Sequence, residues 1–470
     1  MNSKNIKTFF SFSNRKDLSA VLDNEVSTSY YDLFNKAAQL SAGIKQEGIK
    51  EKDYIPLLIA DNLKLIETTI SLWMLGAIPV PLNTKLLEEE IFSILDDQEF
   101  NYLITDRNFS MIKQRANLNF IFIENIKPES ELINPVSPSL NDEAVVIFTS
   151  GSTGRPKGVV HTFLSLISSI ENGNDILGHK EKDRWLASLP FYHIGGFQII
   201  CRSLYFGCTI IIPETLQTNH LADAIIKNNP SHISVVSTQL ERLLYQNINP
   251  GKNLKVSLIG GGFISDDLMF EADRFGWKPF RVYGSSETAS MITAIPADNI
   301  KLKPESVGKP FRNVEIKVSE ESEIVIKSSS LFKKYLNDEK ETSLRLIDNF
   351  YHTGDLGFID ADGYLFIEAR RNDLIVTGGE NVNPIEVEKV LAELPFISEA
   401  CVFPKQSKTW GQIVAAAIVS RDKSVNEKTL KEVLKQKLAG FKIPKQFLFV
   451  DELPKTPLGK LEREKIRKMF

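Results

Sequence analysis

The sequence has little cysteine, and its few cysteines are not arranged for cross-links or metal binding. Among 470 residues there are three, Cys201, Cys208 and Cys401, an odd number without CxxC spacing. Such a set supports neither a disulfide framework nor a zinc cluster. We therefore interpret them as buried thiols in a reducing compartment, and we expect a cytoplasmic protein.

Long apolar runs are also missing. The stretch that comes closest to a membrane span, residues 194–212, is interrupted by Gln198 and Arg202, whereas about 18 uninterrupted apolar residues are needed to cross a bilayer. Residues 1–17 contain no apolar core of the length found in signal peptides. The sequence therefore predicts neither a membrane span nor a secretory leader.

An excess of one charge is absent overall but present locally. The 56 basic and 60 acidic side chains give a formal net charge of −4, which provides no reason to expect nucleic-acid binding. Residues 371–470 hold 18 basic and 13 acidic side chains, a net of +5, which leaves −9 for residues 1–370. Two interpretations stay open: an ordinary solvated face, or a face that approaches an anion such as a nucleotide or coenzyme A.

What the sequence does contain is a regular alternation of short apolar runs with amphipathic segments. A chain of this length exceeds one compact core, and we expect about two to four structural units. The alternation predicts an α/β protein with largely parallel sheets, whose strands end at loops that carry chemistry. The expected strands are residues 54–59, 76–81, 144–148, 209–212, 233–236 and 256–259, with a helix at about 63–75.

The pattern changes from about Val314 onward. Short alternating strands joined by turns such as Asp362-Gly363 predict a β-rich, largely antiparallel subdomain. A polar stretch after Arg370 separates two apolar ones, which is typical of a domain boundary. The predicted architecture is therefore a large N-terminal domain of helix-flanked sheets plus this subdomain, residues 1–370, followed by a small α+β C-terminal domain, residues 371–470.

The strongest single feature is a loop of small, hydroxyl and basic residues, TSGSTGRPKG, which runs from Thr149 to Gly158 directly after the apolar run AVVIF. Small residues let backbone N–H groups approach an anion, and the hydroxyls and Lys157 add further donors. The pattern predicts a phosphate-binding loop. It is not a Walker A loop, because Pro156 precedes Lys157 and Gly158 follows it.

With this loop the chain resembles the adenylate-forming superfamily of AMP-binding enzymes, which includes acyl-CoA synthetases, luciferases and peptide-synthetase adenylation domains. Four further motifs follow in the family's order: YGSSET at 283–288, TGD at 353–355, the segment 370–379 and PKTPLGK at 454–460. The resemblance implies a ligase that activates a carboxylic acid with ATP as an acyl-adenylate. It further implies transfer of the acyl group to a thiol, expected to be coenzyme A, and a mobile C-terminal domain.

The resemblance also implies how the nucleotide is held. A carboxylate must attack an anionic α-phosphate, so positive charge and oriented donors are needed there. Glu287 is expected to hold Mg²⁺, and Thr288 to bond the α-phosphate as a catalytic residue. Tyr283 is expected to face adenine, and Asp355 to accept hydrogen bonds from the ribose. The implied ATP- and AMP-binding residues are Thr149, Ser150, Gly151, Ser152, Thr153, Gly154, Lys157, Gly261, Gly262, Tyr283, Gly284, Asp355 and Arg370.

By the same resemblance, the C-terminal part supplies the remaining roles. Lys460 is expected to bridge the carboxylate and the α-phosphate as a catalytic lysine. Gly378 and Gly379 are expected to line the path of coenzyme A. Asn372 is expected to be the hinge, since asparagine tolerates unusual backbone angles, although it replaces the Asp or Lys of many relatives.

The acid is indicated by residues 189–204, LPFYHIGGFQIICRSL, with VSTQLERLL and IGGG further on. These segments resemble the branch of the superfamily that acts on o-succinylbenzoate, an aromatic dicarboxylate of menaquinone biosynthesis. The resemblance implies that His193 orients the reacting carboxylate, that Gly260 lies against the acyl group and that Arg202 pairs with the second carboxylate. A structural ion pair explains an arginine in an apolar stretch equally well, and that alternative stays open.

Other functions remain as alternatives. A general aryl- or medium-chain acyl-CoA synthetase fits the same motifs. A stand-alone amino-acid adenylation module usually needs an acidic residue for the substrate ammonium, and no candidate stands out in the sequence. A non-catalytic nucleotide-binding protein is expected to lack Lys460 or Glu287, and both are present. The resemblance also leaves a homodimer open.

Overall fold

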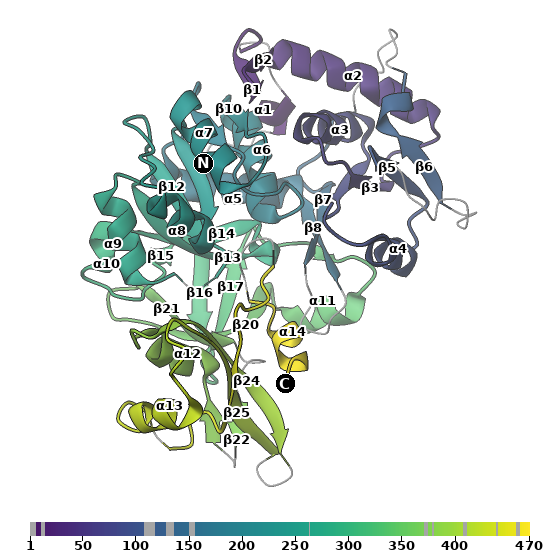
Figure 1. Ribbon diagram of the computed structural model, residues 1–470. Coiled ribbons are helices and arrows are strands. Elements are labelled where there is room, and N and C mark those ends of the chain that lie inside the picture. Colours follow the sequence, from purple (N-terminus) through teal and green to yellow (C-terminus); the bar gives the residue numbers. More distant parts are fainter. Residues whose placement is uncertain are drawn as a thin grey trace.

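Figure 1 shows the computed structural model of the chain. It describes residues 6–10, 15–107, 118–127, 136–149, 156–262, 264–370, 375–377, 380–407, 411–438, 440–456 and 461–470.

A nine-stranded sheet forms the centre of the N-terminal part, in the order β15-β14-β13-β12-β11-β9-β10-β1-β2. The six strands from β13 to β1 run parallel, and the strands at both edges are antiparallel. The carboxyl ends of the parallel strands therefore share one edge of the sheet. The strands are β1 (Ser19–Asp23), β2 (Val26–Ser29), β9 (Arg184–Leu186), β10 (Thr209–Ile212), β11 (His232–Val236), β12 (Val256–Gly260), β13 (Pro279–Ser285), β14 (Ser290–Pro296) and β15 (Lys309–Pro310).

Helices cover both faces of this sheet. Ile210 packs in a core with Trp73 and Trp185, whereas its neighbour Ile211 packs in a second core with Trp277, because successive strand side chains point to opposite faces. The first core lies under α1 (Ile6–Phe10), α2 (Tyr30–Gln46), α3 (Asn62–Leu75), α5 (Phe163–Leu177) and α6 (Ile194–Phe206). The second lies under α7 (Thr218–Asn228), α8 (Ser237–Tyr245), α9 (Asp266–Arg274) and α10 (Ala297–Ile300).

Two smaller sheets complete the body of the N-terminal part. One is fully parallel, in the order β4-β3-β5-β6, and the other is antiparallel, in the order β18-β8-β7. The first comprises β3 (Tyr54–Leu58), β4 (Ile78–Pro81), β5 (Tyr102–Thr105) and β6 (Asn119–Phe122), with α4 (Glu88–Asp97) and the short 3-10 turn η2 (Ile123–Asn125). The second comprises β7 (Glu143–Thr149), β8 (Lys157–Thr162) and β18 (Lys334–Tyr335).

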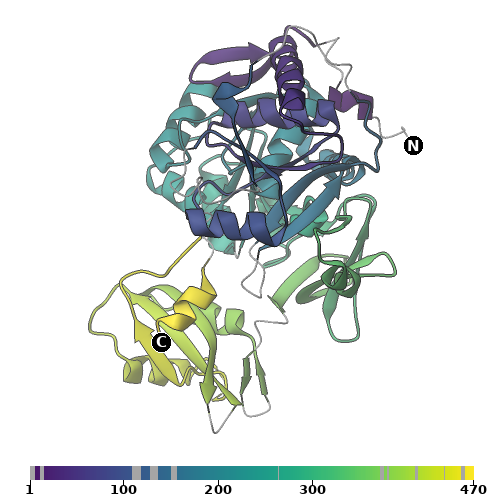
Figure 2. The ribbon, with the colours of Figure 1, turned by 90° about the vertical axis from the view of Figure 1, so that its right-hand side faces the viewer.

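A β-rich subdomain follows, as the alternating pattern predicts. Its strands are antiparallel, and the turn at Asp362-Gly363 closes the hairpin between β20 and β21. Figure 2 shows this subdomain, in green, and the C-terminal part, in yellow, projecting from the same side of the main body. The subdomain comprises β16 (Val314–Val318), β17 (Glu323–Ser328), α11 (Glu339–Arg345), β19 (Leu346–Ile347), β20 (Phe350–Ile359) and β21 (Leu365–Arg370).

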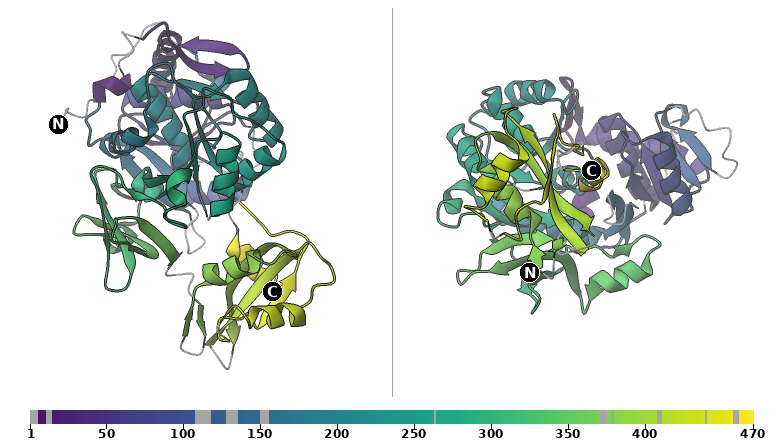
Figure 3. Two further views of the ribbon diagram at one scale, coloured as in Figure 1. Left: turned by 90° about the vertical axis from the view of Figure 1, so that its left-hand side faces the viewer. Right: turned by 60° about the horizontal axis from the view of Figure 1, so that its bottom comes forward.

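The C-terminal part has its own five-stranded sheet and its own apolar clusters. It touches the N-terminal part through an ion pair between Lys389 and Glu305, 2.8 Å, and through Asn383, whose amide donates to the Glu368 carbonyl. Figure 3 shows it from two further sides. It comprises β22 (Ile375–Thr377), β23 (Glu380–Val382), α12 (Pro384–Ala392), β24 (Ile397–Ser407), β25 (Gly411–Ser420), α13 (Glu427–Leu434), β26 (Gln446–Phe449) and α14 (Arg463–Lys468).

The structure confirms the predicted fold class, with a large N-terminal and a small C-terminal part. Most expected strands agree with observed ones to within one or two residues at each end, β10 among them at residues 209–212. The boundary between residues 370 and 371 stays a prediction, and residues 371–374 lie outside the described ones. In the described part of the chain, no helix combines the length and apolarity needed to cross a bilayer.

Candidate active site

The phosphate-binding loop predicted from the sequence joins two antiparallel strands. Thr149 at the end of β7 pairs with Lys157 at the start of β8, so residues 150–156 connect a hairpin. A Walker A loop instead leads from a strand into a helix, so the topology agrees with the exclusion made from spacing. Ser150, Gly151, Ser152, Thr153 and Gly154, all predicted to bind the nucleotide, lie outside the described residues.

Lys157 lies in a cluster of charged and aromatic side chains at the base of this hairpin. Its ammonium is 2.6 Å from a carboxylate oxygen of Glu341 and 5.5 Å from the centre of the Tyr335 ring. The Nε–H of Arg345 donates to the same Glu341 oxygen at 3.1 Å. Burial would by itself raise the pKa of Glu341, but hydrogen bonds from Lys157 and Arg345 outweigh it, and the pKa is lowered. Glu341 is therefore ionised at neutral pH.

Glu287 lies close to this cluster, on a short 3-10 turn, η3 (Ser286–Thr288), after β13. The hydroxyl of Tyr335 donates to its carboxylate at 2.8 Å. From the other side, buried His161 of β8 contacts the Ser286 carbonyl at 2.8 Å through Nε2, which must carry the proton because the carbonyl only accepts. Burial lowers the pKa of His161 to about 4, so the ring is neutral at pH 7.

The Glu287 turn fits a magnesium ion that arrives with a nucleotide. Mg²⁺ is usually held by one or two carboxylates plus substrate phosphates and waters, and seldom by a cage of protein ligands. Within the described residues, no group of three or more His, Cys, Asp or Glu side chains is placed to hold a metal alone. The single carboxylate of Glu287 is compatible with such an ion, and its metal-binding role stays a prediction.

Thr288 is nearly fully buried, and its hydroxyl already contacts backbone atoms. It accepts from the Ser285 N–H at 2.8 Å and lies 2.6 Å from the Ser290 carbonyl. The next residues, Ala289 and Ser290, have φ angles of 54° and 99°, the left-handed region that costs an L-residue energy. In the structure Thr288 holds this strained turn, and its predicted bond to the α-phosphate stays a prediction.

Two helices hold the strained turn through side-chain hydrogen bonds. Ser169 of α5 donates to the Ala289 carbonyl at 2.7 Å, and Gln198 of α6 donates to it at 3.0 Å. Position 284 requires glycine, because a Cβ on Gly284 would lie 2.0 Å from the Ser290 carbonyl oxygen. The predicted contact of Gly284 with the nucleotide stays a prediction.

Tyr283 and Asp355 meet between the large sheet and the β-rich subdomain. The Tyr283 hydroxyl donates to the Asp355 carboxylate at 2.6 Å, and the Thr353 hydroxyl accepts from the Asp355 N–H at 2.9 Å. Burial, with the nearby Asp355 charge, raises the pKa of Tyr283 well above its usual value. The pair predicted for adenine and ribose is thus adjacent. Arg370 pairs with Asp355 through the backbone, but its side chain is outside the described ones.

The predicted acyl pocket begins at the carboxyl ends of β11 and β12. Gly260 ends β12, and a Cβ there would lie 2.8 Å from a Val282 methyl group. Gly261 has a φ of +86°, and a Cβ on it would contact Val236 of β11 at 3.3 Å. A Cβ on Gly262 would meet no atom within 4 Å. Backbone at this edge therefore lies open to a ligand, as expected where parallel strands end.

His193 lies at the same edge, immediately before α6, and its ring is 4.7 Å from that of Tyr192. Burial and the charge of Lys85 lower the pKa of His193 to about 4. The imidazole is therefore neutral at pH 7, which suits it to donate or accept one hydrogen bond to a substrate carboxylate. The structure is compatible with the predicted orienting role, which stays a prediction.

Arg202 is not brought to His193. It lies nine residues further along α6, about 13 Å at 1.5 Å per residue, and its guanidinium rests 5.2 Å from the Trp185 ring centre. It is 1% exposed, and its Nε and Nη2 make no hydrogen bond in the described structure. In the described structure, no contact of Arg202 supports the predicted clamp on a second carboxylate. No described carboxylate forms the alternative ion pair with it either.

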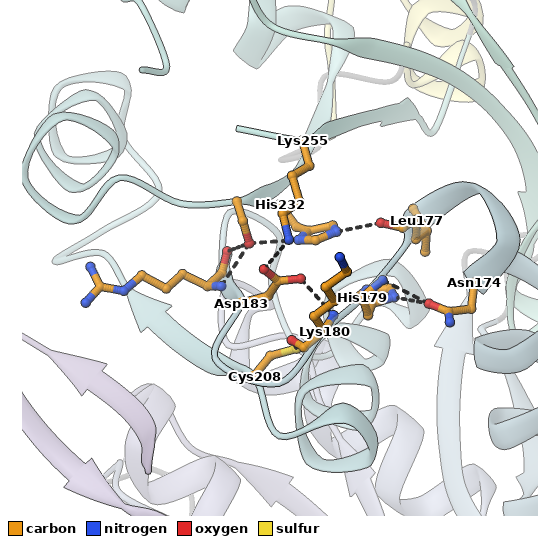
Figure 4. A network of polar contacts seen from close by, with 10 residues as sticks. Asn174, Leu177, His179, Lys180, Asp183, Cys208, His232 and Lys255 are labelled. Atoms are coloured by element: carbon orange, nitrogen blue, oxygen red, sulfur yellow. Dashed lines mark hydrogen bonds and ion pairs between the residues drawn. The ribbon is translucent and has the colours of Figure 1, made fainter. Parts of the chain in front are cut away.

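The surroundings of Trp185 are a stack of buried rings. His179 and His232 stack on each other at 4.7 Å, and both stack on Trp185 at 4.9 Å. Figure 4 shows the polar network beside this stack, in which Asp183 pairs with Lys255 and His232 contacts the Leu177 carbonyl. Burial lowers the pKa of His179 to about 2, so it stays neutral next to the Arg202 charge.

Besides residues 150–154, four predicted residues lie outside the described part of the chain: Asn372, Gly378, Gly379 and Lys460. Sequence reasoning missed three others that the structure places at the site, namely His161, Tyr335 and Glu341. Their partners are 125, 48 and 184 residues away in the sequence. His161 follows an apolar run directly after the loop, on β8, whereas Tyr335 lies on the two-residue strand β18 and has no such local signal.

Comparison with known proteins gives a consistent result. The family model of AMP-binding enzymes matches residues 10–336, and that of the AMP-binding enzyme C-terminal domain matches residues 386–460. A 2-succinylbenzoate–CoA ligase of Bacillus licheniformis is 33% identical over 463 residues, which cover 96% of each chain.

Two solved structures of one bacterial enzyme are similar over nearly the whole chain. The o-succinylbenzoate CoA synthetase of Bacillus subtilis in complex with its acyl-adenylate intermediate has a TM-score of 0.90 and 29% identity, covering 98% of this chain and 97% of that one. The same enzyme in complex with ATP and a magnesium ion has a TM-score of 0.89 and 28% identity, covering 98% and 99%.

Proposed function

Because this chain belongs to the AMP-binding enzyme family, we propose that it is an ATP-dependent acid–thiol ligase. Its reaction converts o-succinylbenzoate to o-succinylbenzoyl-CoA through an acyl-adenylate and releases AMP and pyrophosphate. The observation that carries the proposal is the agreement with 2-succinylbenzoate–CoA ligases over 96% of both chains. The family recognised from the motifs is confirmed.

In the first half-reaction, a carboxylate oxygen of the acid bonds to the α-phosphorus of ATP, and the bond to the pyrophosphate oxygen breaks. Tyr283 and Asp355 hold the adenosine end, and Lys157 supplies positive charge for the phosphates. Glu287 would hold Mg²⁺, whose charge would offset that of the phosphates. A strongly anionic pair of reactants thereby meets in a site whose cations and donors are already oriented.

Lys460 is the catalytic lysine of this step in our proposal. It is carried by the C-terminal domain, residues 371–470, which we propose turns about Asn372 between the half-reactions. In the second half-reaction, the sulfur of coenzyme A bonds to the acyl carbon, and the bond to the AMP oxygen breaks. The local net charge of +5 supports the approach of an anionic thiol, and we propose that Gly378 and Gly379 line its path.

Two groups place the acid in this proposal. Neutral His193 orients the carboxylate that reacts, and the end of β12 at Gly260 lies against the acyl group, with open space at nearby Gly262. None of the three buried cysteines forms a disulfide, which fits the expected cytoplasmic location, and a homodimer remains part of the proposal.

The test is acid-dependent exchange of labelled pyrophosphate into ATP, measured with o-succinylbenzoate, benzoate, coumarate, acetate and fatty acids. We expect exchange with o-succinylbenzoate at least tenfold above the monocarboxylates, about 1.4 kcal/mol of discrimination. Exchange with a monocarboxylate and none with o-succinylbenzoate refutes the acid and favours a general aryl- or medium-chain acyl-CoA synthetase. No exchange with any acid refutes the reaction class.

A further inference from the structure

One carboxylate in the candidate site is shared by two cations. A single oxygen of Glu341, on α11, lies 2.6 Å from the Lys157 ammonium and accepts from the Arg345 Nε–H at 3.1 Å. All three side chains are only 18–26% exposed. The sequence offered no reason to place Arg345 at the site, and the proposed reaction does not use it.

This group lies between the parts of the site expected to hold metal and ribose. Lys157 stacks over Tyr335, whose hydroxyl contacts Glu287 on the metal side. On the ribose side, a Cβ added to Gly354, the neighbour of Asp355, would lie 3.1 Å from Nη1 of Arg345. The phosphates of a nucleotide whose ribose is held at Asp355 and whose metal is held at Glu287 must pass between these two groups.

Two cations that converge on one anionic oxygen form a site for an anion. Arginine and lysine both donate charge-assisted hydrogen bonds to carboxylate oxygens and to phosphate oxygens, and these bonds are short. Lys157 is already the expected phosphate ligand of the hairpin. A phosphate oxygen that reaches Lys157 therefore meets Arg345 as well, and it must compete with the Glu341 carboxylate for both.

We propose that Lys157 and Arg345 form a two-cation clamp for the phosphate chain of ATP, and that Glu341 competes with this chain for the clamp. Glu341 then lowers the affinity for ATP and pyrophosphate while it keeps two like charges close together. Binding of the nucleotide moves its carboxylate away from the two cations. The inference rests on the proposed function for the identity of the nucleotide, but not on the identity of the acid.

The test compares binding of ATP, of pyrophosphate and of adenosine by calorimetry, with no acid present. Glu341→Gln removes the competing charge at constant shape. We expect ATP and pyrophosphate to bind about fivefold more tightly, about 1 kcal/mol, the upper range for a partly exposed ion pair. Arg345→Gln should weaken both by about tenfold or more, as expected when a charge-assisted hydrogen bond is lost. Adenosine should bind each variant equally.

Matched controls lie on the same helix. Glu339→Gln and Lys340→Gln make the same charge changes at exposed positions of α11, and we expect their affinities to match the unchanged protein. Arg345→Lys keeps the charge and should restore part of the loss. Affinities for ATP and pyrophosphate that are unchanged in folded Glu341→Gln and Arg345→Gln overturn the clamp. Absence of ATP binding by the unchanged protein instead refutes the proposed function.

Discussion

The hydroxyl of Tyr335 offers the sharpest test of how the metal-binding carboxylate is positioned. Tyr335 is 3% exposed, its hydroxyl donates to Glu287 at 2.8 Å, and its ring lies under Lys157. Tyr335→Phe keeps the ring contact and removes only the donor. A hydrogen bond to a charged acceptor contributes about 1.5–3 kcal/mol, so misplacement of Glu287 should lower adenylation about tenfold to a hundredfold.

The assay separates the two half-reactions. Pyrophosphate exchange is measured over a range of Mg²⁺ concentrations, and thioester formation is measured from preformed acyl-adenylate. We expect slower exchange that needs more Mg²⁺ and a thioester rate within about twofold of the unchanged protein. Tyr205→Phe is the matched control, because it removes a Tyr–Glu hydrogen bond, to Glu171 at 2.6 Å, between α6 and α5. Exchange and Mg²⁺ dependence equal to the control contradict the reasoning.

Three further predictions concern buried or half-buried groups. The pKa of His161 is about 4 in the folded protein, below its unfolded value, so its contribution to stability is present near neutral pH and is lost as pH falls from about 6.5 towards 4. In urea titrations, His161→Gln should reduce the fall in unfolding free energy between pH 6.5 and 4.5 by about 2 kcal/mol. An unchanged fall contradicts the assignment. Arg202→Met should leave the KM for the acid within about twofold. It should stabilise the fold by about 1 kcal/mol, since it removes a buried charge that has no carboxylate partner in the described structure. A tenfold higher KM instead supports the clamp predicted from sequence. His193→Ala should raise the KM for the acid about tenfold with an unchanged KM for ATP, and equal effects on both substrates contradict an orienting role.

The sequence predicted well what depends on neighbouring residues. Strand β10 has three isoleucines in a row, and all four of its residues are buried because both faces of the sheet are covered there; this run is visible without a structure. The small residues and the lysine of the loop from Thr149 to Gly158 predict phosphate binding, and that role stays a prediction. The resemblance implies separate roles for Tyr283 at adenine and Asp355 at the ribose, and the structure places their side chains 2.6 Å apart.

Contacts between distant segments could not be predicted in this way. Glu341 meets Lys157 across 184 residues, because β18 pairs with β8 and carries α11 to the hairpin. No periodicity in either segment encodes that pairing. For Arg202, the apolar stretch around it correctly predicts burial. It does not predict packing against the face of the Trp185 ring.

The central claim is that the acid reacts at the α-phosphorus of ATP, and an isotope measurement tests it most directly. The protein is incubated with ATP, coenzyme A and o-succinylbenzoate whose carboxylates carry ¹⁸O, and the products are analysed by mass spectrometry. The account predicts one ¹⁸O in each AMP released, together with pyrophosphate free of label and a thioester. AMP without label, or label in orthophosphate with formation of ADP, contradicts an acyl-adenylate.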